Sequence, residues 1–154
     1  MDKILVRGGK PLKGSVQIRG AKNAALPLMA ATILAEDTCV LHNIPCLHDI
    51  FSMDKLLADM GMTIDFTGRS MTMEPQHLHK AEAHYELVRK MRASFFVLGP
   101  LLARFGKCRV SLPGGCAIGT RPVDIHLKGL EALGATIRIE DGYVVAEAKL
   151  KGVN

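Results

Sequence analysis

The feature that most constrains the fold of this chain is an internal repeat. The segment LADMGMTI at 57–64 matches LEALGATI at 130–137, which follows 73 residues later. Lys22 and Arg92 each precede an apolar helical run and lie 70 residues apart. A repeat of this kind indicates similar supersecondary units that stack on one another and bury a shared core. We therefore divide most of the chain into two units, about 21–75 and 91–150.

Each unit is predicted to contain a helix, a strand, a second helix and a hairpin, which is an α/β pattern. The first helix follows Asn23 and is apolar nearly all round, so we expect it to be buried on most sides, with Pro27 in its first turn. Helices at 49–60 and 122–133 should end at Gly61 and Gly134. The expected hairpins pair 63–66 with 71–74, and 136–140 with 143–147. The opening residues 1–20 are predicted to form two strands, 4–7 and 15–18.

Composition bounds the class of protein and of ligand. With 154 residues, 48% hydrophobic and 23% charged, the chain has the balance of a globular domain. We find neither a run of about 20 apolar residues nor a secretory signal pattern, so we expect a cytoplasmic protein that does not interact with membrane. The net charge of +5 is scattered and only 5% of residues are aromatic. This composition favours small anionic ligands over nucleic acid.

The second unit carries seven extra residues between its strand and its second helix, and the inserted stretch includes GGCAIG at 114–119. Loops on rigid scaffolds often carry functional sites. Cys116 lies in this glycine-rich stretch, and Arg121 near a helix start would favour its thiolate form, so we interpret Cys116 as a reactive thiol. The alternative is a small apolar residue in a loop. For the three other cysteines, packing is the expected role: Cys39, Cys46 and Cys108.

Three cations fall near predicted helix starts, where free N–H groups and the helix dipole attract anions. Lys22 with Asn23, Arg92 and Arg121 together suggest a phosphate or carboxylate site, although each cation alone could be a solvated helix cap. Asp124 and His126 could be caps or ligand contacts. The remaining histidines have no ligand set at a familiar metal spacing, so no metal site is expected.

Four segments are specific enough to suggest a family: RGAKNA at 19–24, MRAS at 91–94, LPGGC at 112–116 and GTRPVD at 119–124. Together they resemble the enolpyruvyl transferases that act on UDP-N-acetylglucosamine. The resemblance implies an inside-out α/β barrel like that of EPSP synthase, in which six units form two domains. It also implies transfer of enolpyruvyl from phosphoenolpyruvate to the sugar 3'-hydroxyl with release of phosphate, the first committed step of peptidoglycan synthesis, without metal or organic cofactor.

By the same resemblance, Cys116 is the general acid that protonates the methylene carbon of phosphoenolpyruvate. Lys22 and Arg121 would bind phosphoenolpyruvate charge, and Asn23 would contact the reacting centre. The residues implied for the sugar nucleotide are Arg92, Arg121, Pro122, Val123, Asp124 and Ile125.

The resemblance also implies incompleteness. Residues 1–20 would pack in the other domain, while residues 21–154 would supply two units of a three-unit domain, without the third unit and the catalytic base. The partner would then be the rest of the same protein, or a second copy through self-association. Two alternatives stay open: a non-catalytic anion- or nucleotide-binding or assembly module, and an enolpyruvyl transferase acting on shikimate 3-phosphate.

Overall fold

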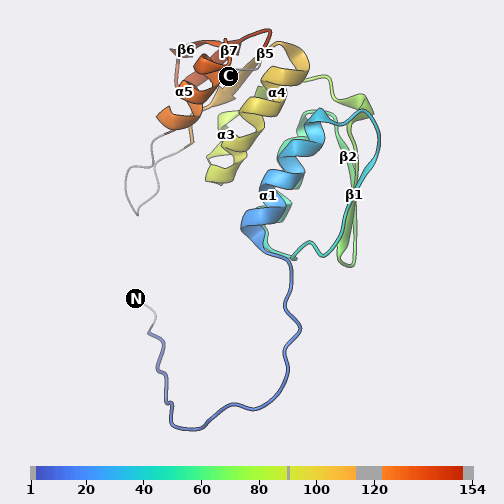
Figure 1. The fold of residues 1–154 in the computed structure, drawn as a ribbon, viewed down its shortest axis with the longest axis vertical. Helices are drawn as coiled ribbons and strands as arrows, with labels where there is room; N and C mark the ends of the chain where they lie inside the picture. The colour runs from blue at the N-terminus through green and yellow to red at the C-terminus, as the bar shows by residue number, and fades with distance from the viewer. Residues whose placement is uncertain (1–2, 90, 114–122, 151–154) are drawn as a thin grey trace.

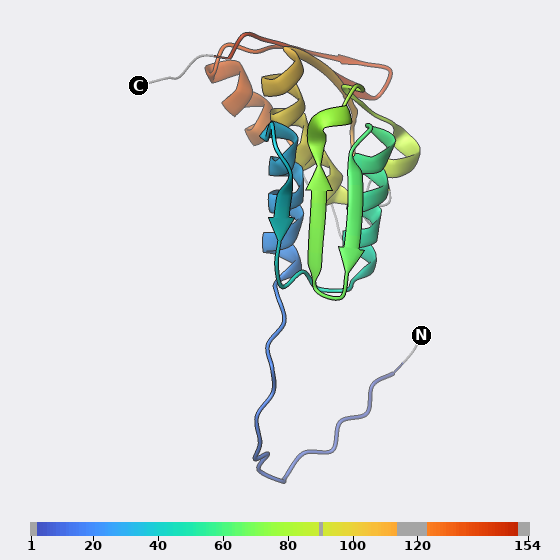
Figure 2. The ribbon, with the colours of Figure 1, turned by 90° about the vertical axis from the view of Figure 1, so that its right-hand side faces the viewer.

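The first unit folds as three antiparallel strands covered on one face by two helices. The computed structural model describes residues 3–89, 91–113 and 123–150. The elements of this unit are α1 (Lys22–Ala31), the 3₁₀ turn η1 (Thr32–Leu34), β1 (Cys39–Leu41), α2 (His48–Asp59), β2 (Thr63–Thr67) and β3 (Ser70–Glu74). The sheet order is β1-β3-β2, and Figure 2 shows α1 and α2 behind it. The predicted second helix and hairpin are confirmed to within a residue at most ends.

The second unit has the same strand order with one strand added at its edge. Its sheet runs β4-β5-β7-β6, in which β5, β7 and β6 are antiparallel like β1, β3 and β2. The elements are β5 (Lys107–Ser111), α5 (Asp124–Ala132), β6 (Thr136–Glu140) and β7 (Tyr143–Glu147), preceded by α4 (Leu98–Phe105). The hairpin turns at Asp141 and Gly142, which both have positive φ, as a tight primed turn requires.

A connecting stretch joins the two units and contributes the added strand. It contains η2 (Pro75–His77), β4 (Glu82–Ala83) and α3 (Tyr85–Val88), and the second unit then begins with the 3₁₀ helix η3 (Arg92–Val97), which leads directly into α4. Strand β4 pairs with β5 in parallel. The sequence predicted none of the short elements of this connection.

The core lies between the two sheets, on the faces that carry the helices. In Figure 1 the helices α1 and α4 lie side by side between the sheet of the first unit and that of the second. Fully buried residues come from both units, including Met29, Leu57, Met73, Leu101 and Val110. Arg104 of α4 also crosses between the units, since it donates hydrogen bonds to the carbonyls of Ile33 and Ala35 at 2.7 Å. No helix in the described part of the chain is long and apolar enough to cross a bilayer.

Two predictions about the start of the chain are wrong. Residues 4–7 and 15–18 do not form strands: the segment before α1 is extended and exposed, with Ile4 91% and Leu12 98% accessible. A strand needs a hydrogen-bonded neighbour, and the described chain offers none here. Helix α1 begins at Lys22, so Pro27 lies in its second turn and not its first.

The apolar first helix is also less covered than its composition predicts. Ala25, Leu26, Met29 and Ala30 are buried, but Leu28 on the opposite side is 52% exposed. The reason is that the sheet and the neighbouring helices cover only one side of α1. The second apolar run differs as well, because it begins as the 3₁₀ helix η3 before it becomes α4.

Candidate functional site

Lys22 and Asn23 are the first two residues of α1 and are both exposed. Ala21 precedes them in an extended conformation, and no side chain caps the helix. The N–H groups of Ala24 and Ala25 both donate to the Ala21 carbonyl at 3.1 and 3.0 Å, which leaves the amides of Lys22 and Asn23 at the open end of the helix. The helix start therefore presents N–H groups, the positive end of the dipole and one ammonium group, a combination that suits an anion.

The chain immediately before this helix is held against a neighbouring loop. A Cβ atom on Gly20 would lie 1.9 Å from the backbone oxygen of Asn43, so only glycine fits there. Asn43 itself has a φ of 58°, and the adjacent Ile44 donates its N–H to the Arg69 carbonyl at 2.9 Å. This contact fixes the backbone from which Lys22 extends.

The Lys22 side chain ends on a carboxylate from α2. Its Nζ lies 2.6 Å from Oδ2 of Asp49, with side-chain exposures of 43% and 30%. Asp49 stands in the first turn of α2, where the helix dipole stabilises a negative charge. The sequence prediction placed Asp49 only at a helix start and missed its pairing with Lys22. The repeat could have identified Asp49 as a candidate site residue, because Asp49 precedes Ile50 as the predicted site residue Asp124 precedes Ile125.

The second unit brings its own helix starts to the same end of the molecule. Figure 1 shows α1, α4 and α5 running in the same general direction, so that their N-terminal ends face one side. Arg92 is the first residue of η3, which packs against α1. The structure thus places Lys22 and Arg92 on contacting elements, although Arg92 opens a short 3₁₀ helix and not the α-helix expected from the sequence.

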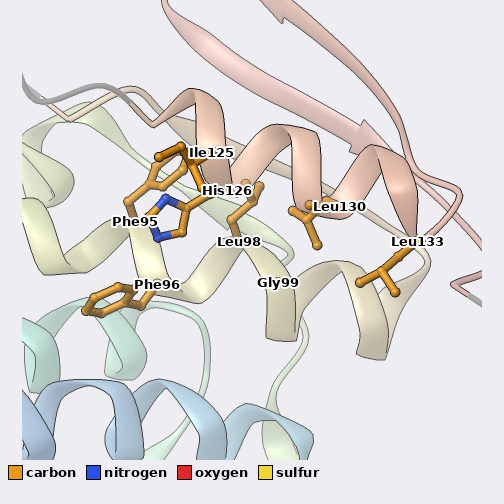
Figure 3. Close-up of a pocket in the computed structure, with 9 residues that line it drawn as sticks. Phe95, Phe96, Leu98, Gly99, Ile125, His126, Leu130 and Leu133 are labelled. Carbon is orange, nitrogen blue, oxygen red and sulfur yellow. The ribbon is translucent and has the colours of Figure 1, made fainter. Parts of the chain in front are cut away.

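The start of α5 lies beside an apolar cavity. Val123 is the N-cap residue, and Asp124 and Ile125 are the first two residues of the helix. Ile125 is 75% exposed and, with His126, lines a cavity of about 410 Å³ between α5 and the η3–α4 segment (Figure 3). The His126 ring stands edge-on to Phe95, with centroids 6.1 Å apart. The sequence prediction did not include the cavity, because its walls meet only in the folded chain.

Three predicted site residues, Cys116, Arg121 and Pro122, lie outside the described residues. The other cysteines differ in their surroundings. Cys108 is buried, and burial raises the pKa of its thiol to about 12, as expected for a packing residue. Cys46 is exposed in the loop before α2, so the packing role predicted for it is wrong. Within the described ranges, no three His, Cys, Asp or Glu side chains are placed to hold a metal ion.

Comparison with known proteins gives one family match that spans nearly the whole chain. The family model of EPSP synthase (3-phosphoshikimate 1-carboxyvinyltransferase) matches residues 6–154. Among solved structures, the enolpyruvyl transferase NikO from Streptomyces tendae superposes with a TM-score of 0.77 at 24% identity, over 92% of this chain and 31% of that one. EPSP synthase from Acinetobacter baumannii gives a TM-score of 0.66 at 20% identity, over 95% of this chain and 35% of that one. These structures share the fold.

Curated relatives are much more similar in sequence. The UDP-N-acetylglucosamine 1-carboxyvinyltransferase of Desulforapulum autotrophicum is 60% identical over 153 residues, which is 99% of this chain and 37% of the relative. The enzyme of the same name from Acinetobacter baylyi is 56% identical over 156 residues, covering all of this chain and 37% of the relative. The chain therefore spans little more than a third of the length of these relatives.

Proposed function

Because this chain belongs to the EPSP synthase family of carboxyvinyltransferases, we propose that it forms part of an enzyme that transfers enolpyruvyl from phosphoenolpyruvate to UDP-N-acetylglucosamine. The observation that carries the proposal is the 60% identity over 99% of the chain to a UDP-N-acetylglucosamine 1-carboxyvinyltransferase. The relatives that act on this sugar nucleotide are 49–60% identical. The EPSP synthase structure from Acinetobacter baumannii is only 20% identical to this chain, so shikimate 3-phosphate is the less favoured acceptor.

In the proposed reaction the sugar 3'-oxygen bonds to the central carbon of phosphoenolpyruvate and its hydroxyl proton passes to the catalytic base expected outside residues 1–154, while Cys116 donates a proton to the methylene carbon. Loss of inorganic phosphate and of one methyl proton from the tetrahedral adduct then restores the double bond. Lys22 at the start of α1 would neutralise substrate charge together with Arg121, and Asn23 would contact the reacting centre. The residues proposed for the sugar nucleotide are Arg92, Arg121, Pro122, Val123, Asp124 and Ile125. The reaction would be the first committed step of peptidoglycan synthesis and would take place in the cytoplasm.

We further propose that residues 1–20 pack against another domain, and that residues 21–154 supply two units of a domain whose third unit is not in this chain. The exposed apolar side chains of residues 4–18 and the exposed side of α1 support this arrangement. The chain matches only 37% of the length of this relative. A second function therefore stays open, in which the isolated chain is a non-catalytic module that binds anions or nucleotides. Partners would then be the remaining part of the same protein or a second copy.

A chimera tests the catalytic proposal. In it, the matching segment of the Desulforapulum autotrophicum enzyme is replaced by this chain, and phosphate release from phosphoenolpyruvate is measured. We expect release that depends on UDP-N-acetylglucosamine, and a loss of about 100-fold or more in Lys22→Ala because a site charge is removed. Lys80→Ala is the matched control. Lys22 pairs with Asp49 at the start of α2, whereas Lys80 pairs at 3.4 Å with Asp59, the last residue of α2.

The outcomes separate the alternatives. Release that depends on shikimate 3-phosphate and not on UDP-N-acetylglucosamine would contradict the proposed acceptor. Equal losses in Lys22→Ala and Lys80→Ala would contradict the proposed site. For the 154-residue chain alone, calorimetric binding of UDP-N-acetylglucosamine without phosphate release would support the module.

A further inference from the structure

The ion pair between Lys22 and Asp49 links the starts of two packed helices. Lys22 opens α1, Asp49 stands in the first turn of α2, and the two helices pack against each other. The Nζ–Oδ2 distance of 2.6 Å lies well within the range of a salt bridge. Both partners extend from helical backbone, so the relative position of the two charged groups is set by the packing of α1 on α2.

The surroundings of the pair restrict it further. Gly20 lies in direct contact with the backbone of Asn43, and this contact joins the segment that enters α1 to the loop that leads into α2. Ile44 of that loop is buried and hydrogen-bonded to Arg69. The carboxylate and the ammonium therefore approach from two segments that are themselves fixed to each other.

We propose that Asp49 is a positioning residue, which holds the Lys22 ammonium group in place to receive the anionic group of a substrate. This inference rests on the proposed function. A lysine ammonium is a flexible point charge on a four-carbon stem. The Asp49 carboxylate pairs with this ammonium group, which has three N–H donors and so keeps donors for a ligand at the start of α1. A partly exposed ion pair of this kind contributes little to folding stability, so its loss should affect substrate binding more than folding.

The internal repeat supplies a second reason. The position of Lys22 in the first unit corresponds to Arg92 in the second, and the position of Asp49 corresponds to Asp124 in the first turn of α5. Each unit therefore has a cation at the start of its first apolar run and an acid at the start of its second helix. The same combination in both units is expected if the acid serves the cation.

The chain provides a matched control in the pair Lys80–Asp59. Asp59 is the last residue of the same helix α2, and its side chain is 35% exposed against 30% for Asp49. The Lys80 side chain is 44% exposed against 43% for Lys22. Removing either acid breaks one Lys–Asp pair of α2, but only Asp49 lies at the proposed site.

Steady-state kinetics of the chimera described above test the inference. We expect Asp49→Ala to raise the KM for phosphoenolpyruvate by about tenfold, with little change in the KM for UDP-N-acetylglucosamine, because one charge is misplaced and no contact to the sugar is lost. Asp49→Asn keeps an acceptor oxygen in the same place and should recover part of the effect. Asp59→Ala should match the parent. Equal effects of Asp49→Ala and Asp59→Ala, or equal rises in both KM values, would overturn the inference.

A second measurement uses the same chimera and does not depend on activity. Limited acylation of lysines, read by peptide mass spectrometry, should label Lys22 several-fold faster in Asp49→Ala, with Lys80 unchanged, because the ammonium group loses its partner. Asp59→Ala should speed acylation of Lys80 and leave the rate at Lys22 unchanged. An unchanged Lys22 rate in Asp49→Ala would show that Asp49 does not hold the ammonium. An inactive parent chimera would contradict the proposed function instead, and the acylation rates would still decide the role of Asp49.

Discussion

Gly20 has a greater effect on the candidate site than its lack of a side chain suggests. Its Cα faces the carbonyl of Asn43 so closely that a methyl group would occupy the position of the oxygen. The neighbour is backbone, not the end of a flexible side chain, so it can move only if the loop before α2 moves. That loop carries Asn43 and leads to Asp49, while Gly20 leads to Lys22. The glycine therefore affects both partners of the ion pair.

We expect Gly20→Ala to lower the free energy of unfolding by about 1–3 kcal/mol, as overpacking of a close contact does. The substitution should also speed acylation of Lys22, because the start of α1 is displaced from Asp49. Gly129→Ala is the control, since nothing lies within 4 Å of a Cβ atom there and alanine favours the interior of a helix. Urea unfolding and mass mapping of the chimera measure the two effects. A neutral Gly20→Ala would contradict the close contact.

The cysteines should differ sharply in reactivity. Cys116 is predicted to react fastest with iodoacetamide, because its glycine-rich segment and Arg121 favour an accessible thiolate. Cys108 should react slowest, since burial raises the pKa of its thiol to about 12 and the protonated thiol is not the nucleophile. Labelling at pH 8 with and without urea tests the order. Preferential labelling of Cys108 in the folded chain would contradict the burial of its thiol, and preferential labelling of the exposed Cys46 would count against Cys116 as the reactive thiol.

At the scale of the elements, Arg104 joins the two units. Its Nη1 donates to the carbonyls of Ile33 and Ala35 at 2.7 Å, and its Nη2 donates to the Pro75 carbonyl at 3.2 Å. The Ile33 and Ala35 oxygens lie at the end of η1, where helical hydrogen bonding leaves carbonyls without partners, whereas the Pro75 carbonyl at the start of η2 also accepts the Leu78 N–H at 3.1 Å. One guanidinium of the second unit therefore links the end of η1 to the start of the connecting stretch.

We expect Arg104→Ala to destabilise the chain by about 1–3 kcal/mol, because three partly buried carbonyls lose a charged donor. Arg104→Lys should recover little, since an ammonium cannot reproduce the planar fork. Arg138→Ala is the control: its side chain is 57% exposed and pairs with Glu140 and Glu147 on the surface. Denaturant unfolding of the chimera compares the three variants. A loss for Arg138→Ala as large as that for Arg104→Ala would contradict this account.

The elements that the sequence predicted well are those with a local cause. The turn at Asp141 and Gly142 favours left-handed backbone at both residues, and alternating side chains then define the strands on either side. Gly61 and Gly134 end their helices with φ values of 102° and 97°. These features depend on neighbours along the chain, so a single sequence is sufficient to find them.

The elements that were missed or wrong depend on distant contacts. Strand β4 has two residues and exists because Glu82 and Ala83 pair with Arg109 and Val110. The opening segment has the strand pattern, but the described chain gives it no neighbour. In the site, helix starts were predictable from Lys22 and Asp124, whereas the pairing of Lys22 with Asp49 and the cavity beside Ile125 required the folded arrangement.

At the scale of the whole molecule, apolar side chains on the helical layer remain uncovered. Leu28 and Leu34 on the α1–η1 segment are 52% and 54% exposed, and Ile125 on α5 is 75% exposed. The cavity between α5 and the η3–α4 segment has mainly apolar walls. Isolated apolar residues are common on protein surfaces, but a set gathered on one layer indicates a surface that normally contacts another element.

We therefore expect the isolated 154-residue chain to self-associate or to bind a hydrophobic dye as a partly molten state. Leu28→Glu combined with Ile125→Glu should reduce association, because the charges make burial of that surface costly. Val40→Glu is the control, since Val40 is 50% exposed but lies on strand β1 of the three-stranded sheet and not on a helix. Co-expression with the remaining segment of a relative should suppress both association and dye binding. Sedimentation velocity over a range of concentrations decides the question: a compact monomer without dye binding would mean that two units close a core by themselves.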